Sequence, residues 1–418
     1  MTFFFFLSKS AGLRNINLKL IDESLNIDFT FHLPLYIDTK DWEEEKQRPK
    51  NIYLKKYKRL NAILDKLRVS INNFAHRNSG KFQITQRALS KHIKDICNAK
   101  ETVYPKDSLL YHMDSYIISK KESICKSTYK RYKVFYNLLQ RFEGYCSKTL
   151  YIHEIDMLVV NKFLSFGKKE EYSENTIYRT VHFMKTILNF AERKGIHTCL
   201  RELEIRREKQ QRDIITLSEE EILKIKNTQV PRELEKAKNW LLISCYTGQR
   251  VSDFMKFTTD KIVKVNGCEC LGFVQQKTKK EIILPLHRTV LNLIIANNYS
   301  FPEPMDIQQY NADIKNIARV SNLSQIIEAR KRKDHRTKIM KVEKWEVLSS
   351  HIGRRSFATN FYGKIPTPLL MDATGHSTEQ MFLNYINPIN EDRILSLSHY
   401  FDEMYKKRNS GLTAKNSC

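Results

Sequence analysis

The stretch "SSHIGRRSFATNFYGKIPTPLLMDATGHSTEQMFLNY", residues Ser349–Tyr385, decides the fold that this chain predicts. One of its first two serines is expected to cap a helix. His351 and Arg354 lie three residues apart on that helix, and therefore on one face. Gly363 is expected to end the helix, because glycine readily adopts the left-handed conformation found after helix ends.

Two further short helices follow in the same stretch. Thr367 followed by Pro368 is typical of a helix start, and Gly375 stands where a left-handed C-cap would close that helix. His376 comes directly after it. A third helix then leads to Tyr385, which shares a face with its apolar neighbours at i−4 and i−3. The pattern predicts that two histidines, an arginine and a tyrosine converge.

An earlier motif adds a second arginine. A helical stripe ends at Thr247–Gly248, which is expected to turn the chain so that Arg250 points inward, and Ser252 is expected to cap the next helix. Arg250 and Arg354 are planar, permanently charged groups that suit the non-bridging oxygens of one phosphate. Asp253 is assigned a supporting role.

These motifs together resemble one enzyme family. Thr-Gly-x-Arg at 247–250, His-x-x-Arg at 351–354 and Gly-His at 375–376, with a tyrosine nine residues later, resemble the tyrosine recombinase (phage integrase) family. The sequence around these motifs is similar to that of integrases of bacterial conjugative transposons and related DNA invertases, in the segments "SCYTGQRVSDF", "FVQQKTKKEIILPLH" and "SSHIGRRSFATN". The likeness covers most of the chain. It implies a site-specific DNA recombinase that cleaves, exchanges and religates strands.

The resemblance implies roles for the site residues. Tyr385 would be the nucleophile, giving a 3′-phosphotyrosine and a free 5′-hydroxyl. The two arginines and His376 would stabilise the negative charge that grows on the phosphate. His351 would accept the tyrosine proton, or else donate to the phosphate. Because the phosphotyrosine conserves the bond energy, neither a metal nor a nucleotide cofactor is expected.

The general acid is expected on a β-hairpin. Gly272–Gln276 and Glu281–Leu286 are predicted to be its two strands, with three lysines in the turn between them. A lysine at this tip can protonate the departing 5′-oxygen. The family's Lys-Thr pair favours Lys277, while Lys279 and Lys280 stay open as alternatives. Relatives often have glycine where Lys279 stands.

Composition agrees with a nucleic-acid partner. The chain has 418 residues, a formal net charge of +24 and a pI near 9.5, which favours binding to a polyanion. The sequence contains no long apolar span. Its eight cysteines lack metal-site spacing, and Cys268 and Cys270 are expected in a turn between strands rather than in half a zinc site. Free thiols favour a reducing bacterial cytoplasm.

Residues 1–96 predict a small α+β module. Alternating apolar residues indicate three strands before a helical stripe that begins near Leu60. In the resembling integrases this position holds an arm-type domain that binds DNA away from the crossover. A solubility or oligomerisation module is the alternative. A linker is expected between Cys97 and Asp107, where Pro105 breaks the pattern.

Residues 107–205 predict a core-binding domain of four helices, with basic residues on the faces opposite their cores. The candidate DNA-binding residues are Lys130, Arg131, Lys133, Arg179, His182 and Lys185. The alternative for each of them is a solvated surface charge. Arg201–Asp213 is expected to be a linker that lies along the DNA.

Residues 214–406 are predicted to form a mixed α/β catalytic domain, and residues 407–418 a disordered tail. Arg330–Lys333 and His335–Lys338 are expected to form a basic loop that either contacts phosphate or is merely solvated. Ile394–Met404 is expected to be a helix that packs on a neighbouring protomer, or equally in cis.

The sequence therefore predicts a multidomain, mainly α protein with small β elements. The expected partners are double-stranded DNA, three further protomers in a tetramer on two DNA sites, and accessory DNA-bending proteins. Two alternatives stay open. One is a catalytically silent DNA-binding protein, and the other is a topoisomerase of related chemistry.

Overall fold

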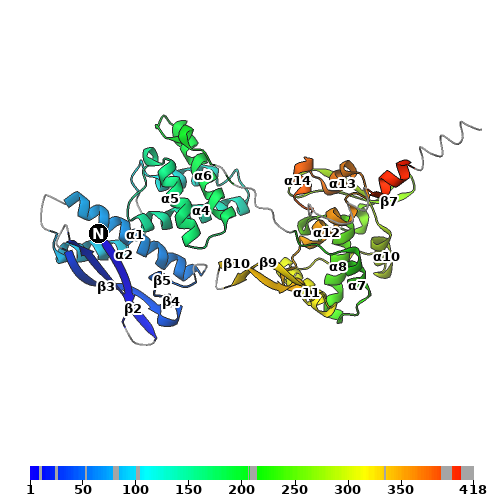
Figure 1. The fold of residues 1–418 in the computed structure, drawn as a ribbon, viewed down its shortest axis with the longest axis horizontal. Helices are drawn as coiled ribbons and strands as arrows, with labels where there is room; N and C mark the ends of the chain where they lie inside the picture. Colours follow the sequence, from blue (N-terminus) through cyan, green and yellow to red (C-terminus); the bar gives the residue numbers. More distant parts are fainter. Residues whose placement is uncertain are drawn as a thin grey trace, which may run out of the picture. The chain divides into compact units, whose positions relative to one another are not determined.

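The computed structural model describes residues 1–8, 12–23, 27–51, 54–78, 84–99, 104–205, 207, 214–333, 336–386 and 398–405. The chain divides into two compact units (Figure 1). The first unit comprises Met1–Lys209 and Arg332–Lys338, and the second comprises Gln210–Lys331 and Ile339–Cys418. Among the described helices, none combines the length and the apolar character that a membrane span requires.

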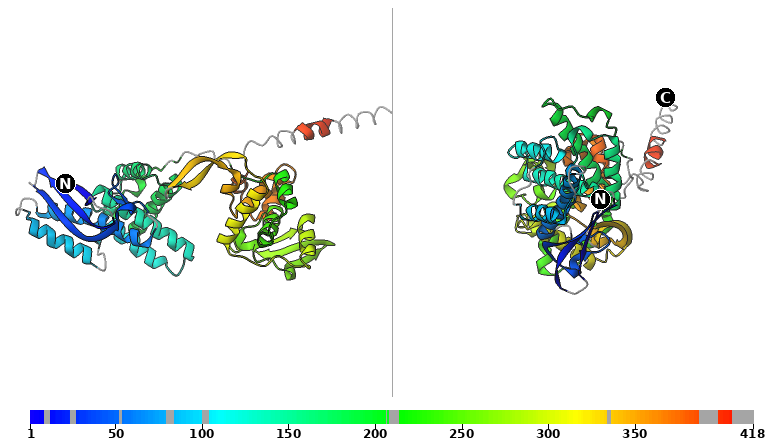
Figure 2. Two further views of the ribbon diagram at one scale, coloured as in Figure 1. Left: turned by 90° about the horizontal axis from the view of Figure 1, so that it is seen from below. Right: turned by 90° about the vertical axis from the view of Figure 1, so that its left-hand side faces the viewer.

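The first unit begins with a three-stranded antiparallel sheet of order β1-β2-β3. Its strands are β1 (Thr2–Leu7), β2 (Leu13–Asp22) and β3 (Ile27–Asp38). Alternation sets the buried face: Phe3 and Phe5 are buried, whereas Phe4 and Phe6 are about 40% exposed. Two helices, α1 (Lys55–Asn78) and α2 (Gln86–Asn98), lie against the sheet (Figures 1 and 2). The predicted strands are present, but the sequence analysis missed α2 and the short pair β4 (Trp42–Glu43) and β5 (Arg48–Pro49).

A second hydrophobic core in the same unit belongs to the four predicted helices. These are α3 (Leu109–Lys120), α4 (Lys126–Cys146), α5 (Met157–Lys169) and α6 (Glu174–Glu192). Ser108, Asp156 and Ser173 cap α3, α5 and α6 through their side-chain oxygens. The hydroxyl pair Ser127 and Thr128 is the expected cap of α4, but the helix starts earlier, at Lys126, with Cys125 as its N-cap.

Buried charges join the two cores of the first unit. Asp65 on α1 accepts from Arg48 at 3.2 Å and from Arg141 on α4 at 3.1 Å, and Arg141 also pairs with Glu170 at 3.2 Å. All four side chains are buried. The two helices approach closely, since a Cβ on Gly144 would lie 2.5 Å from the Cβ of Asp65. Residues before and after the expected linker therefore belong to one unit.

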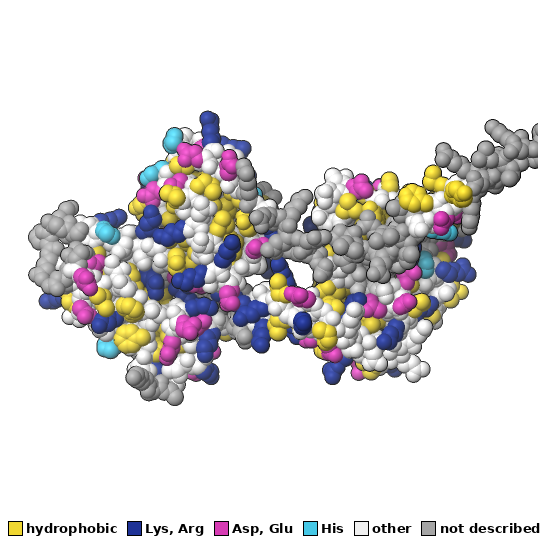
Figure 3. Space-filling model, viewed as in Figure 1, with side chains coloured by type: hydrophobic (Ala, Val, Ile, Leu, Met, Phe, Trp, Pro, Cys, Tyr) yellow, Lys and Arg dark blue, Asp and Glu magenta, His cyan; other side chains and the backbone are white. Residues whose placement is uncertain are grey.

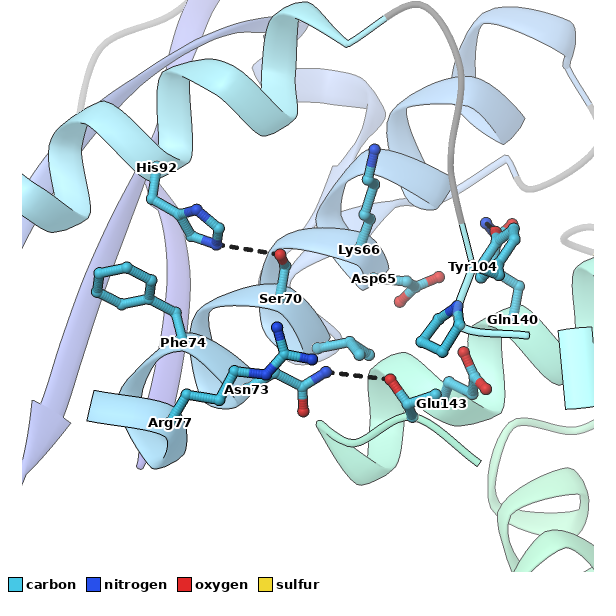
Figure 4. Close-up of a pocket in the computed structure, with 13 residues that line it drawn as sticks. Asp65, Lys66, Ser70, Asn73, Phe74, Arg77, His92, Tyr104, Gln140 and Glu143 are labelled. Atoms are coloured by element: carbon cyan, nitrogen blue, oxygen red, sulfur yellow. Dashed lines mark hydrogen bonds between the residues drawn. The ribbon is translucent and has the colours of Figure 1, made fainter. Parts of the chain in front are cut away.

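A cavity of about 370 Å³ lies beside this contact, between α1, α2 and α4 (Figure 4). His92 Nε2 lies 3.1 Å from Ser70 Oγ, and Asn73 Nδ2 donates to Thr149 Oγ1 at 3.0 Å. Glu143 also lines the cavity, and its Oε1 accepts from the backbone N–H of Leu150 at 2.9 Å. Burial raises the pKa of Glu143 to about 8, so its carboxyl group is protonated at neutral pH.

The second unit packs helices around the buried helix α8 (Arg232–Thr247). The other main helices are α7 (Glu219–Asn227), α10 (Arg288–Ala296), α11 (Ile307–Val320) and α12 (Ile352–Phe361). Gly353 permits the close contact of α12 with α8, because a Cβ there would lie 1.9 Å from Ser244 Oγ. An antiparallel sheet of order β6-β7-β8 lies at one side; its strands are Ile262–Val265, Cys268–Val274 and Glu281–Pro285.

Two local predictions in this half of the chain need correction, and two others lie partly or wholly outside the described residues. The expected basic loop at 330–338 is part of a strand pair, β9 (Ile326–Lys333) and β10 (Arg336–Glu343). Cys268 and Cys270 lie on β7 and not in a turn, with Cys270 buried on its inner face. Residues 398–405 are helical and exposed, whereas residues 394–397 and the predicted tail at 407–418 lie outside the described residues.

Candidate active site

The turn after α8 places Arg250. Gly248 ends the helix with φ of 66°, and a Cβ there would lie 2.5 Å from the Phe357 ring, so both the turn and the packing require glycine. Arg250 is itself the N-cap of α9 (Val251–Phe254), and Ser252 lies inside that helix rather than capping it. The Arg250 side chain makes no cap bond and reaches the hairpin, where its NH1 donates to Gln275 Oε1 at 3.1 Å.

Arg354 is fully buried at the centre of the site. Helix α12 starts at Ile352 with His351 as its N-cap, in place of the predicted serine cap. Arg354 NH1 donates to Gly248 O at 2.9 Å and NH2 donates to Thr374 O at 2.8 Å, which fixes the guanidinium plane. Burial and the charge of Arg250 lower the pKa of Arg354 to about 10, and the group stays charged at neutral pH.

His376 follows the left-handed residue Gly375 (φ 71°), which ends α13 (Thr367–Thr374). Because Arg354 can only donate, the 3.0 Å contact of its NH2 with His376 Nε2 makes that nitrogen an acceptor. The proton therefore lies on Nδ1, which donates to Thr374 Oγ1 at 2.8 Å. Burial and the neighbouring charges of Arg354 and Arg250 lower the pKa of His376 to about 3, so the ring is neutral.

Tyr385 lies directly against this pair. Helix α14 (Glu379–Leu383), capped by Thr378, carries the chain back to the site, and Tyr385 N donates to Phe382 O at 2.9 Å. The ring centroid of Tyr385 lies 5.0 Å from that of His376 and 5.4 Å from the guanidinium carbon of Arg354. The Tyr385 side chain is half-buried.

His351 lies exposed at the start of α12. Desolvation of its ring lowers its pKa, and the charges of Arg355, Arg354, Arg250 and Lys277 lower it further. A neutral imidazole at neutral pH suits a group that accepts a proton.

The hairpin turn between β7 and β8 carries the three candidate lysines, all exposed. Strand pairing ends at Val274 and Glu281, two residues short of the predicted strand end at Gln276. Lys279 adopts the left-handed conformation with φ of 58°, and its N–H donates to Gln275 O at 2.9 Å. The turn thus keeps a glycine-type geometry without a glycine. Lys277 lowers the pKa of His351, whereas Lys280 pairs with Asp372 at 3.5 Å.

Two buried glutamines and an aspartate complete the site, and the sequence analysis had singled out only the aspartate. Gln249 and Gln275 are both fully buried. Asp253 Oδ1 accepts from Gln276 N at 2.9 Å and so holds the hairpin, and the charge of Asp253 favours the charged form of Arg354. A polar residue at a position expected to be inward-facing in a strand was the available signal for Gln275.

The six candidate DNA-binding residues lie on α4 and α6, which pack together through stacked rings of Tyr132 and Phe183, 4.4 Å apart. Two of them have protein partners: Lys133 pairs with Asp114 at 3.0 Å, and the ammonium group of Lys185 donates to Leu203 O. The other four are exposed; these are Lys130, Arg131, Arg179 and His182. Figure 3 shows Lys and Arg side chains spread over the viewed face of the first unit, with acidic side chains among them.

Two segments of the chain match models of known protein families. Residues 108–199 match the phage integrase SAM-like domain, and residues 207–391 match the phage integrase family. A comparison with curated proteins found no match. The chain belongs to the phage integrase family, and its function is site-specific DNA recombination of the tyrosine type.

Solved structures show the same fold. The Tn1549 transposon integrase in complex with a circular intermediate DNA is 14% identical, with a TM-score of 0.54 over 70% of this chain and 99% of that one. The same integrase bound to transposon right-end DNA is 13% identical, with a TM-score of 0.53 over 71% of this chain and 99% of that one. Lambda integrase bound to a core site is 19% identical, with a TM-score of 0.48 over 66% of this chain and 95% of that one. The two matches to the Tn1549 integrase confirm the mainly helical, multidomain fold.

Proposed function

We propose that recombination proceeds through a covalent bond between Tyr385 and the 3′ end of the cleaved strand. The observation that carries the proposal is the position of the Tyr385 ring, 5.0 Å from the His376 ring and 5.4 Å from the guanidinium carbon of Arg354. The phenolic oxygen attacks phosphorus, the bond from phosphorus to the 5′-oxygen breaks, and religation reverses these steps. The phosphotyrosine keeps the energy of the broken bond.

Arg250 and Arg354 would hold the non-bridging oxygens of the scissile phosphate. The bonds of Arg354 to two backbone carbonyls preorganise its guanidinium group, so little rearrangement is needed when charge develops on the phosphate. His376 is a neutral acceptor in the DNA-free protein. To donate to a bound phosphate, His376 would carry its proton on Nε2, and the bond that Nε2 now accepts from Arg354 NH2 would give way to one with the phosphate.

The two proton transfers are assigned to His351 and Lys277. His351 would accept the proton of Tyr385, which its lowered pKa supports, because the ring is neutral at neutral pH. Lys277 would donate a proton to the leaving 5′-oxygen. Its influence on His351 supports this choice, as does the ion pair that holds Lys280 on Asp372.

A nicked suicide duplex that bears the protein's own site tests covalency. The full chain should become linked to a 3′ end, whereas Tyr385→Phe should bind the duplex with unchanged affinity and form no adduct. Tyr299→Phe is the matched control, since this tyrosine is 72% exposed in the same unit and should react as the wild type does. An adduct in Tyr385→Phe would refute the assignment.

We also propose the following organisation on DNA. Residues 1–96 serve as an arm-type DNA-binding module, residues 107–205 as the core-binding domain, and residues 214–406 as the catalytic domain. Tyr400, Phe401 and Met404 are more than half exposed on the helical segment 398–405, which supports packing of this segment on another protomer of a tetramer. The proposed location is the bacterial cytoplasm, on DNA, and accessory DNA-bending proteins are proposed as further partners.

A further inference from the structure

Gln275 lies behind the proposed catalytic groups and uses its whole hydrogen-bonding capacity. Its Oε1 accepts from Arg250 NH1 at 3.1 Å and from Thr278 Oγ1 at 2.6 Å. Its Nε2 donates to Gln249 Oε1 and to Thr374 O, both at 3.0 Å. Since a guanidinium group only donates, Arg250 fixes the orientation of the amide, and a flipped amide would lose this bond.

These four bonds connect three separate elements of the second unit. Arg250 and Gln249 lie in the turn between α8 and α9, Thr278 lies in the lysine turn, and Thr374 ends α13. Thr374 in turn contacts the two buried groups of the site: its carbonyl accepts from Arg354 at 2.8 Å, and its hydroxyl group accepts from His376. Gln275 is therefore hydrogen-bonded directly to Arg250, and it is linked through Thr374 to Arg354 and His376.

The loop that carries His376 is built around this amide. A Cβ on Gly375 would lie 2.5 Å from Gln275 Oε1 and 2.7 Å from its Nε2, so the backbone of the loop contacts the amide directly. Gln249 supports the same arrangement, because its Nε2 donates to Ala373 O at 2.7 Å, one residue before Thr374. A buried amide with four partners is stiff, because any rotation leaves buried polar atoms unpaired.

We propose that Gln275 is a positioning residue for strand cleavage, which holds Arg250 and the lysine turn in register with the loop that carries His376. The inference rests on the proposed function, because it concerns the same site. Gln275 itself does not touch the reacting atoms. Its effect arises through Arg250 on the phosphate oxygens and through the lysine turn on the leaving 5′-oxygen.

Two variants separate these two effects. Gln275→Met keeps the length and volume of the side chain and removes all four hydrogen bonds. Thr278→Val, in the exposed turn, removes only the bond to the lysine turn. Gln308→Met, on the exposed first turn of α11, is the control outside the site.

The measurement is single-turnover cleavage of the suicide duplex by the full chain at saturating DNA. Gln275→Met is expected to slow cleavage by about 10- to 100-fold, the size of effect that follows a displacement of about 1 Å. DNA affinity should stay close to that of Gln308→Met. The midpoint of thermal unfolding should fall below that of Gln308→Met, because Gln249 Oε1 loses the donor that it has in the interior. Thr278→Val should slow cleavage by a few-fold.

A substrate with sulfur in place of the 5′-oxygen needs no general acid, because a thiolate leaves unprotonated. Thr278→Val should cleave this substrate at the wild-type rate, and Gln275→Met should recover only partly. In an Arg250→Ala background on the sulfur substrate, Gln275→Met should add no further loss, since both of the routes through which it acts are already removed.

Wild-type cleavage by Gln275→Met on the ordinary substrate would overturn the proposal. So would an undiminished loss in the Arg250→Ala background on the sulfur substrate. If Gln275→Met fails to fold, Thr278→Val decides the matter: a slow variant that sulfur does not restore would overturn the proposal. Each of these results leaves the role of Tyr385 intact, whereas an adduct in Tyr385→Phe would refute the proposed function alone.

Discussion

Replacing Glu143 by glutamine removes an ionisable group from the cavity between α1, α2 and α4 (Figure 4). Glu143 is 4% exposed, and its Oε1 accepts from Leu150 N at 2.9 Å, a bond that the glutamine amide oxygen retains. Burial raises its pKa from 4.5 to about 8. At neutral pH the folded protein therefore holds a proton that the unfolded chain releases.

The magnitude follows from this difference in pKa. The proton on Glu143 contributes its full stabilisation when the pH is below 4.5, the pKa in the unfolded chain. This stabilisation is lost as the pH rises through about 8, the pKa in the folded protein. At about 1.36 kcal/mol per pKa unit, the loss amounts to about 5 kcal/mol in total, of which about 3 kcal/mol falls between pH 5 and pH 8. Glutamine does not ionise, so Glu143→Gln does not suffer this loss. Its free energy of unfolding relative to the wild type should therefore rise by about 3 kcal/mol from pH 5 to pH 8.

The free energy of unfolding of the first unit is measured in urea at pH 5 and at pH 8. After equilibration, each sample receives a short deuterium pulse at one common pH, which labels the unfolded segments. Mass spectrometry of peptides from α4 gives the unfolded fraction at each urea concentration. Glu122→Gln, at an exposed position, is the control. Asp65, Lys66 and His92 also line the cavity and are the same in both proteins. A stability difference between Glu143→Gln and the wild type that is the same at both pH values would refute the reasoning.

Four further predictions concern the site and the first unit. Lys277→Ala should slow cleavage by about 10²- to 10⁴-fold and recover on the 5′-sulfur substrate; recovery by Lys279→Ala instead would move the acid along the turn. Lys279→Gly should stabilise the second unit by about 0.5–1 kcal/mol in urea unfolding, because φ of 58° strains a residue with a Cβ. The cleavage rate should fall toward acid, at a pH lower than the ordinary histidine pKa of 6.5, as His351 gains its proton, and His351→Gln should lose this dependence; a rate that rises toward acid would favour a phosphate donor. Removal of residues 1–96 takes Asp65 from the buried Arg141 and should lower the stability of the remaining helical core by up to about 3 kcal/mol, measured by thermal unfolding; an unchanged midpoint would contradict the shared ion network.

Local sequence patterns determined much of this protein. The spacing of apolar residues predicted α3, α4, α5 and α6, because a helix face repeats within one or two turns. Glycines at 248 and 375 marked helix ends, and both adopt the left-handed conformation. The motif residues Arg354, His376 and Tyr385, which the structure brings together, were found because their spacing within one short stretch matches a family pattern.

Cap positions and strand pairing were less predictable. The helix caps at Cys125, Arg250 and His351 each differ by one or two residues from the predicted hydroxyl groups. A hydroxyl side chain is a good cap, but the start of a helix is also set by the packing of its apolar face. The β9–β10 pair was mistaken for a basic loop, since dense positive charge hides the alternation of a strand.

Only the tertiary structure decided the contacts behind the site. Gln275 and Thr374 are 99 residues apart, yet a hydrogen bond of 3.0 Å joins them. The same holds for Asp65 and Arg141, 76 residues apart, which tie two hydrophobic cores into one unit. For Gln275 the local sequence offers only its inward-facing place in a predicted strand, and nothing near Asp65 distinguishes it from a surface polar residue. In both cases the partner that makes burial favourable comes from another element. Sequence spacing therefore determined which residues share a helix face, and packing determined which distant polar groups meet in the interior.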